Sequence, residues 1–428
     1  MKSRFFGLIA VLTIITVIMV ACDTGGGDNG NNNNNNSNGE EPNNDKYANA
    51  VRAQGSNFAE KFDWVKQNAQ AGGMYAIELL ENVVLDSTQT FSFTPSVSNS
   101  VSVARSTSNF ETTVILMSGD ANVVVEFSLF GMGSIFTVEK NVNLVLHRGI
   151  SLDGKANNNK ALVVVKKDAT LTMEPDTVIR NNTNSGDGGG VYIEEGAAFI
   201  MNGGAITDCV SKGSGGGVYI YPAGTFIMNG GSIERCSAGG SDSSRGGGGV
   251  RVDTTFTSPP VRGTFIMNGG AIFENTIGAT ALGIANTGGG GVSNHGDFTM
   301  NGGVISKNDI TNTNIKYWGG GVVTWGTFTM TGGLIWGNTA GQGGGVNVSQ
   351  SGIFEKTGGT IQGTEQATLN ANKAVDTFDK DGVTGIHRGD AVYAYGAKLY
   401  RNKTHEIGKM FLDKSNEETA LGWDGKAN

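Results

Sequence analysis

Residues 298 to 308 read FTMNGGVISKN, and four close copies of this stretch occur elsewhere in the chain. FIMNGGAITDC starts at Phe199, FIMNGGSIERC at Phe226, FIMNGGAIFEN at Phe265 and FTMTGGLIWGN at Phe328. In an extended chain alternate side chains face the same way, so the Phe and the Met of each copy point together. The chain turns at the Gly pair, after which the Ile points inward again. Each copy therefore predicts two short strands that share one apolar side.

A second element, GGGV, precedes these copies, and its Val recurs at positions 191, 218, 250, 292, 322 and 346. The aromatic position of the first element recurs at 199, 226, 265, 298, 328 and 354, with Leu171 as an earlier copy. The 68 Gly residues, against six Pro, come in blocks at fixed places in this period. Stacked coils would place like residues over like, about 4.8 Å apart.

The pattern predicts an all-β fold, a right-handed parallel β-helix solenoid, because parallel crossovers favour that hand. A β-propeller is excluded because the units lack a hairpin dipeptide between their short strands. The elements also resemble the repeats of the polymorphic outer-membrane protein family, within the pectate-lyase-like β-helix superfamily. GGGV stands for the GGA-like tetrapeptide of that family, and IFEN at Ile272 and ISKN at Ile305 stand for its F-x-x-N-like one.

This resemblance covers about residues 130 to 400 and implies the β-helix fold rather than an activity. Full-length members of the family end in a membrane β-barrel. The last residues here, LGWDGKAN, show no run of alternating ten-residue strands, so we expect the chain to lack that translocator.

The N-terminus has the pattern of an export signal, with Lys2 and Arg4 before the apolar run 5–21. The run ends in Met19-Val20-Ala21-Cys22, which resembles a bacterial lipobox. We therefore predict a lipoprotein signal peptide at 1–21 and lipidation of Cys22, with an uncleaved membrane anchor as the alternative. The implied location is a membrane-anchored lipoprotein of the outer membrane, at the cell surface.

Four further segments follow. Residues 22–46 are rich in Asn and Gly and predict a disordered tether. Residues 47–130 predict an N-terminal cap, with a capping helix and the first coils, 131–400 the β-helix, and 401–428 a C-terminal cap or tail. The capping helix should start at Asn57, which has Glu60 three positions later, and should end before the Gly pair at 72–73.

The last position of the repeated stretch predicts a ladder inside the solenoid. Asn275, Asn308 and Asn338 each fall three residues after the inward Ile, so their side chains should stack as amides at one turn. Cys209 and Cys236 hold the same slot in two earlier coils. Side chains in parallel register are poorly angled for a disulfide, so we predict two buried thiols.

Catalytic chemistry is not expected. Polysaccharide-cleaving enzymes on such folds need paired carboxylates, or an acid cluster with a basic partner, on adjacent coils. The acids of the repeats fall in different slots or alternate with neutral residues (Asp208, Glu234, Glu274, Glu355), and the four His share no slot. We expect no metal and no cofactor. The net charge of −8 argues against a nucleic-acid partner.

Two short motifs favour structural readings. Residues 379–382, DKDG, match part of a calcium loop, but Thr377 and Arg388 stand where that loop needs acids. The tripeptide Arg388-Gly389-Asp390 fills the GGG slot before a last, decayed coil, so we interpret it as structural rather than as an adhesion motif.

Loops of unequal length and one aromatic group depart from the repeat. The loops 237–246, 276–287 and 309–318 and the insertion 253–263 lie in the middle coils. The aromatic candidates for binding are Tyr317, Trp318, Trp325 and Trp336. Their alternative role is packing against the solenoid wall. We predict a non-catalytic surface lipoprotein whose loop edge binds a glycan or a host or matrix protein. The alternatives are a polysaccharide lyase or hydrolase and a structural or antigenic coat protein.

Overall fold

The computed structural model describes residues 46–92, 111–119, 122–127, 132–155, 158–239, 246–278, 288–310, 318–349, 351–363, 372–374, 392–394, 398–401, 404–407 and 410–412. Several features predicted from the sequence lie outside them: the signal peptide with Cys22, the tether except Lys46, Tyr317, the 379–382 motif and the 388–390 tripeptide. Residues 240–245, 279–287 and 311–317 of the three loops, and most of the 401–428 tail, lie outside them too. The solenoid lies within the unit Asn49–Asn428, and Met1–Ala48 form a separate unit.

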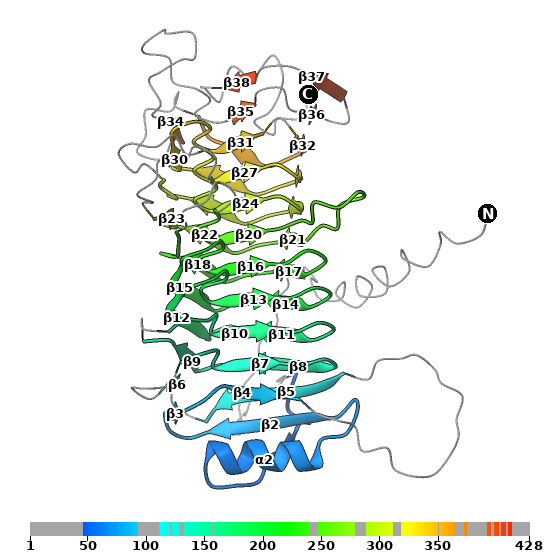
Figure 1. Ribbon diagram of the computed structural model, residues 1–428, viewed down its shortest axis with the longest axis vertical. Coiled ribbons are helices and arrows are strands. Elements are labelled where there is room, and N and C mark those ends of the chain that lie inside the picture. Colours follow the sequence, from blue (N-terminus) through cyan, green and yellow to red (C-terminus); the bar gives the residue numbers. More distant parts are fainter. Residues whose placement is uncertain are drawn as a thin grey trace, which may run out of the picture. The chain divides into compact units, whose positions relative to one another are not determined.

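The solenoid is an all-β parallel β-helix with three sheets, and each full coil gives one strand to sheets A, B and C in turn (Figure 1). Sheet A has 13 strands: β1 (Val51–Arg52), β2 (Met74–Leu79), β5 (Thr112–Ser118), β8 (Val142–Leu146), β11 (Thr170–Met173), β14 (Ala198–Met201), β17 (Thr225–Met228), β21 (Thr264–Met267), β25 (Asp297–Met300), β28 (Thr327–Met330), β32 (Ile353–Lys356), β36 (Lys398–Arg401) and β37 (Thr404–Ile407).

Sheet B contains β3 (Val83–Leu85), β6 (Val123–Phe127), β9 (Ile150–Asp153), β12 (Val178–Asn184), β15 (Ala205–Ser211), β18 (Ser232–Glu234), β19 (Ser237–Ala238), β22 (Ala271–Phe273), β23 (Thr276–Ile277), β26 (Val304–Ser306), β29 (Leu334–Trp336) and β33 (Thr360–Ile361). The short strands β30 (Thr339–Ala340) and β34 (Lys373–Ala374) pair with each other.

Sheet C contains β4 (Gln89–Phe91), β7 (Phe136–Val138), β10 (Val163–Val165), β13 (Val191–Ile193), β16 (Val218–Ile220), β20 (Val250–Val252), β24 (Val292–Asn294), β27 (Val322–Thr324), β31 (Val346–Val348), β35 (Val392–Ala394) and β38 (Met410–Leu412). Strand pairs between coils are parallel, except that β35 pairs with β38 and β36 with β37 in antiparallel fashion.

The repeated stretch has the predicted register. Phe226 pairs with Phe265, and Phe265 with Phe298, while the Met of each copy lies over the Met of the next. The six Phe from Phe199 to Phe354 form a buried stack with ring centroids 4.7 to 4.9 Å apart. Leu171 pairs with Phe199 and extends the column. The core is therefore a set of columns that run along the solenoid.

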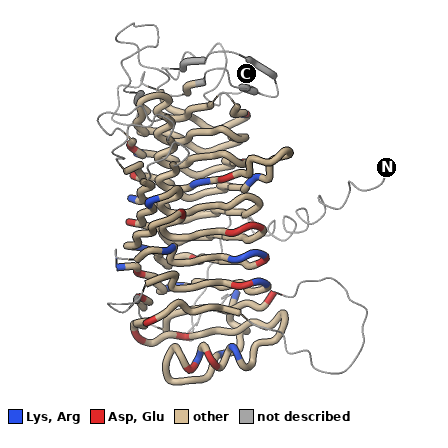
Figure 2. Tube along the Cα trace, viewed as in Figure 1, with Lys and Arg blue, Asp and Glu red and all other residues tan. Residues whose placement is uncertain are grey.

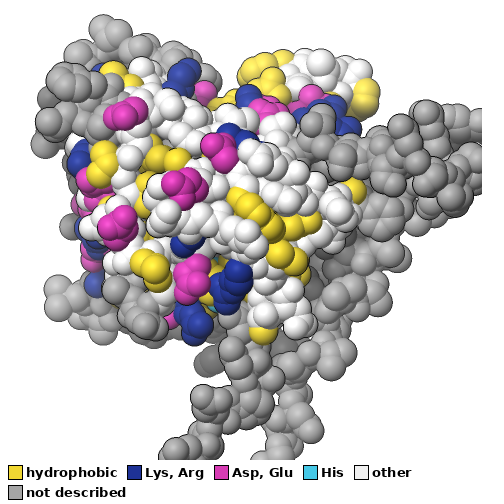
Figure 3. All heavy atoms as spheres, turned by 90° about the horizontal axis from the view of Figure 1, so that it is seen from below, with side chains coloured by type: hydrophobic (Ala, Val, Ile, Leu, Met, Phe, Trp, Pro, Cys, Tyr) yellow, Lys and Arg dark blue, Asp and Glu magenta, His cyan; other side chains and the backbone are white. Residues whose placement is uncertain are grey.

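One end of the solenoid is capped by the predicted helix, α2 (Phe58–Asn68). Asn57 accepts a hydrogen bond from the backbone of Glu60 at 3.0 Å, and the Glu60 carboxylate binds Ser56 instead of Asn57. Phe58, Phe62 and Val65 are buried, and Phe62 meets Phe91 of the first sheet C strand edge to face at 4.8 Å. Figure 3 views this end, where apolar and charged side chains are interspersed.

Candidate functional site

The strands of sheet C place two columns of side chains on the outside of the solenoid. In the V-x-V pattern the first and third residues face the core, as Val250 and Val252 do, so the second residue and the one after the strand face outward. Successive coils are paired in register. We use the name sheet C row for the outward side chains of four successive coils: Tyr219, Arg251, Asp253, Ser293, His295 and Trp325.

The centre of the sheet C row is a hydrogen-bonded charged group. The Tyr219 hydroxyl donates to the Asp253 carboxylate at 2.5 Å. The Arg251 guanidinium donates to the other oxygen of Asp253 at 3.3 Å and to the Ser293 hydroxyl at 3.1 Å. Arg251 is only 4% exposed, and its Nε has no hydrogen-bond partner in the described part of the chain. A buried guanidinium without full hydrogen bonding is costly, which makes this position unusual for a purely structural wall.

Burial and charge fix the protonation states of the row. Burial, and then the negative charge of Asp253, raise the pKa of Tyr219 far above its ordinary value, so the phenol remains a donor. Burial, and then the positive charge of Arg251, lower the pKa of His295 to about 2, so the imidazole is neutral. Its Nε2 is buried without a hydrogen-bond partner among the described residues.

Aromatic pairs lie at both ends of the row. Tyr219 stacks on Tyr192 of the preceding coil with ring centroids 5.1 Å apart. At the other end the Trp325 ring lies 4.4 Å from the His295 ring and 6.3 Å from the Trp318 ring. Tyr219 and Trp325 are three coil spacings apart, which is roughly 14 Å at about 4.8 Å each. Tyr219, Arg251 and Ser293 are buried, whereas Tyr192 at one end and His295, Trp318 and Trp325 at the other are partly exposed. The row thus has accessible aromatic rings at its two ends and a covered polar centre.

The structure divides the aromatic group that the sequence suggested. Trp318 and Trp325 lie together beside sheet C, but Trp336 is the last residue of β29 in sheet B. There the Lys307 ammonium lies 5.6 Å from the centroid of its ring, a cation–π contact. Trp336 is therefore not part of the sheet C row, and Tyr317 is outside the described residues.

One segment that departs from the repeat lies wholly within the described residues. Residues 253–263 join β20 to β21 as a projecting arm (Figure 1), whereas the three loops, which follow sheet B strands and precede sheet C strands in the chain, are described only at their ends. Thr254 and Arg262 form an antiparallel bridge at its base, and Phe256 is 97% exposed. Arg262 binds the next coil through the Asp297 carboxylate at 2.9 Å. Figure 2 shows charged residues at the base of the arm and none at its tip.

Sequence reasoning missed Asp253 and His295 although a signal was present. Both follow the Val of GGGV by three residues, a slot shared with Glu194, Tyr221 and Trp325. Asp253 looked like the start of an insertion, and the four His were compared across the whole chain rather than within this slot. The structure places Asp253 beside Arg251 on one coil and His295 in the same slot of the next coil, positions that the comparison of the repeat acids did not include.

The predicted inner ladder is present and longer than predicted. The Asn308 Oδ1 accepts hydrogen bonds from the backbone N–H and the side-chain amide of Asn275, both at 3.0 Å. Asn338 receives the same pair of bonds from Asn308, and Asn372 receives them from Asn338. Asn275 accepts from the backbone N–H of Cys236 at 2.9 Å. All these Asn side chains are fully buried, so the ladder holds the coils together and is not a binding surface.

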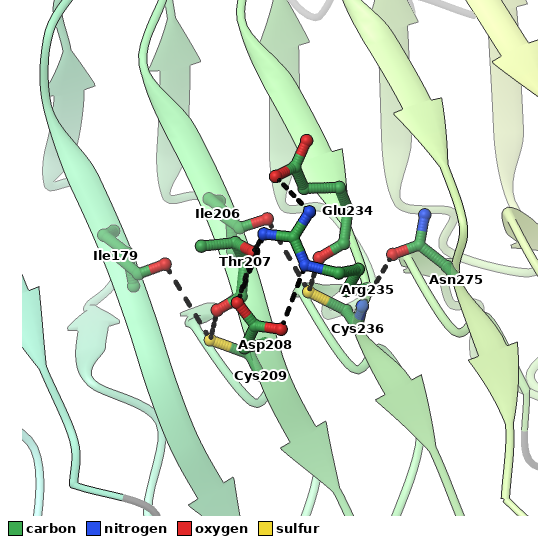
Figure 4. Close-up of polar contacts among 9 residues, drawn as sticks. All are labelled: Ile179, Ile206, Thr207, Asp208, Cys209, Glu234, Arg235, Cys236 and Asn275. Atoms are coloured by element: carbon green, nitrogen blue, oxygen red, sulfur yellow. Dashed lines mark hydrogen bonds and ion pairs between the residues drawn. The ribbon is translucent and has the colours of Figure 1, made fainter.

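Cys209 and Cys236 occupy the same slot as free, buried thiols (Figure 4). The Cys209 Sγ lies 3.4 Å from the Thr207 carbonyl oxygen, and the Cys236 Sγ lies 3.3 Å from that of Glu234. The contact with Cys236, and then burial, raise the pKa of the Cys209 thiol well above its ordinary value. Such thiols are poor nucleophiles, which supports a packing role.

The ion pair above these thiols is exposed. Arg235 binds Asp208 at 3.2 Å and Glu234 at 2.7 Å, and about half of the Arg235 side chain is exposed. Exposed pairs of this kind contribute little to stability.

No family model, curated protein or solved structure matches this chain. Within the described ranges, no three His, Cys, Asp or Glu residues are grouped as metal ligands would be. The helix in the described part of the chain is too short to cross a bilayer. The fold and the geometry of the sheet C row are therefore the basis for any functional conclusion.

Proposed function

We propose that the protein binds a carbohydrate along the outer face of sheet C. The observation that carries this proposal is the order of side chains over five coils, from Tyr192 to Trp325: an aromatic pair, a hydrogen-bonded charged centre and a second aromatic pair. Aromatic rings can contact the C–H faces of sugars, while the polar groups between them orient hydroxyl or carboxylate groups.

The test is a glycan array followed by titration of the full chain in detergent. Trp325→Ala should weaken binding of the selected glycan by more than about tenfold, equivalent to about 1.4 kcal/mol. Trp336→Ala is the matched control, because it removes the same side chain from sheet B and should leave the affinity unchanged. Equal glycan affinity of wild type and Trp325→Ala would contradict a binding surface on sheet C. A loss of glycan affinity in Trp336→Ala alone would contradict it as well.

We propose that binding is not followed by cleavage. The sheet C row contains one carboxylate, Asp253, whereas glycoside hydrolysis usually needs two. Glu194, in the same slot two coils away, is held in an ion pair with Lys166 at 2.6 Å. The pair of Asp253 with Arg251 is the observation that favours the alternative, a polysaccharide-cleaving enzyme. Release of new reducing ends from the bound glycan by wild type, lost in Asp253→Asn, would establish that alternative.

Export and lipid anchoring complete the proposal. The charged start, the apolar run and the lipobox-like end at Cys22 support a surface lipoprotein in which the solenoid presents sheet C to glycans of a host or matrix. Cys22→Ala should abolish acyl labelling and leave an unprocessed precursor; equal labelling of that variant would contradict the anchor. An antigenic coat protein, the third possibility, predicts that the array shows no ligand at all.

A further inference from the structure

The outer face of sheet A, away from the proposed carbohydrate site, carries a regular array of side chains. The Phe and the Met of each strand point inward in β14, β17, β21, β25 and β28. The residue before the Phe, the one between Phe and Met, and the one after the Met therefore point outward. They form three columns, which together we name the sheet A array: Ala198, Thr225, Thr264, Asp297 and Thr327; then Ile200, Ile227, Ile266, Thr299 and Thr329; then Asn202, Asn229, Asn268, Asn301 and Thr331.

The array is flat. Neighbouring Phe rings directly behind it are inclined by only 4 to 7° from β14 to β28, at centroid separations of 4.7 to 4.9 Å. Adjacent strands of ordinary sheets are rotated by about 20 to 25°, and flat sheets need stacking or side-chain ladders to hold them. The outward columns therefore repeat with nearly the same spacing and direction from coil to coil.

The side chains of the array are held in place before any ligand binds. In the third column each amide donates to that of the preceding coil, Asn229 to Asn202 at 2.9 Å and Asn268 to Asn229 at 2.8 Å. Asn301 donates to Asn268 at 2.9 Å, and the Thr331 hydroxyl continues the ladder at 2.8 Å. Thr and Ile are stiff at χ1 because they are branched at Cβ. Ordering them on binding costs little entropy.

The array carries almost no charge. Asp297 is its one ionisable side chain, and the Arg262 guanidinium binds its carboxylate at 2.9 Å and the Thr327 hydroxyl at 3.0 Å. Such a face offers nothing to a polyanion or to an anionic membrane. It also has no outward aromatic ring, so it lacks the anchor that would hold one flexible chain from solution.

We propose that the sheet A array binds the surface of an ordered, neutral polysaccharide, in which packed chains repeat like the coils. Each Thr hydroxyl or Asn amide contributes a weak contact, and the Ile column can cover C–H groups of sugar rings. Many weak contacts add up only when both partners are rigid and periodic, because neither then loses much conformational entropy. A packed solid meets this condition, and a soluble oligosaccharide does not.

The experiment measures partition of the detergent-solubilised full chain onto microcrystalline cellulose and onto crystalline chitin. Wild type should bind at least one of the two solids, and Ile266→Lys should reduce the partition constant at least tenfold, because it places a charge at the centre of the array. Thr329→Lys, in the same column two coils on, is a second variant in case the first is poorly folded, which circular dichroism reports. Ser232→Lys adds the same charge at an outward position of sheet B and should bind like wild type.

Trp325→Ala separates this proposal from the carbohydrate site of sheet C: it should keep the affinity for the solid while losing that for the soluble glycan. Failure of wild type to bind either solid would overturn the proposal, as would undiminished binding by folded Ile266→Lys and Thr329→Lys. Binding of the protein to ice crystals, without binding to cellulose or chitin, would also overturn the proposal, since the periodic ligand would then not be a polysaccharide.

Discussion

Replacement of Asn308 by Ala tests whether the inner amide ladder holds the coils together. The Asn308 side chain makes four hydrogen bonds: it accepts two from Asn275 at 3.0 Å and donates to Asn338 at 2.9 Å and to the Ile272 carbonyl at 3.1 Å. All of these groups are buried. The variant leaves the Asn275 backbone N–H without an acceptor in a site that water does not reach.

The expected cost follows from those losses. A buried polar group left without a partner costs about 1–3 kcal/mol, and each further hydrogen bond lost about 1 kcal/mol. Asn338 Oδ1 keeps the bond from the Asn308 backbone at 3.0 Å, so it is not orphaned. One orphaned N–H and three further lost hydrogen bonds predict destabilisation by about 4–6 kcal/mol. Asn301→Ala is the matched control, because Asn301 lies in a similar ladder on the exposed face of sheet A, where water can replace it. We expect it to cost less than about 1 kcal/mol.

Urea unfolding followed by circular dichroism gives the global comparison. Hydrogen exchange at the Asn275 amide gives the local one, since coils contact mainly their neighbours and can open separately. Asn308→Ala should accelerate exchange of this amide, while Asn301→Ala should leave it protected. Equal destabilisation by the two variants would refute the assignment of the inner ladder as the main polar link between coils.

Three further predictions test the turns, the protonation of the sheet C row and the thiols. Gly270 has φ +80° and an added Cβ would lie 2.7 Å from the Gly231 carbonyl oxygen, so Gly270→Ala should destabilise by more than about 1–2 kcal/mol in thermal unfolding. Gly278→Ala, where the nearest atom is 3.7 Å away, should not. Because the pKa of His295 is about 2 when folded and about 6.5 when unfolded, the unfolded chain binds the extra proton between these values. Stability should therefore fall as pH drops from 6.5, by at most about 1.4 kcal/mol per pH unit, and unfolding at pH 7 and pH 5 should show a smaller loss for His295→Gln. Iodoacetamide should label Cys209 and Cys236 only after unfolding, and a native crosslink between them in peptide mass spectra would contradict their reduced state.

The fold could be predicted from the sequence because its cause is local and repeated. The alternation of Phe298 and Met300 sets the inward columns. Every copy of the stretch predicts the same inward side, so the assignment does not depend on any single coil. The capping helix was predictable for a similar reason, since Asn57 and the Phe58–Val65 stripe lie within one short segment. The antiparallel pairing of β36 with β37 was not, because neither strand belongs to the repeat.

The candidate site was harder to predict because its residues differ from coil to coil. A repeat reveals what stays constant, and the outward slots of sheet C are the ones in which successive coils place Tyr, Arg, Ser and Val. Asp253 and His295 become visible only when positions are numbered from the GGGV element and read across coils. Once the register is known, however, variability on an otherwise uniform wall is itself informative. Packing favours the same small residues in every coil, so a buried Arg251 paired with Asp253 needs a cause other than the repeat, and the proposed carbohydrate binding would supply one.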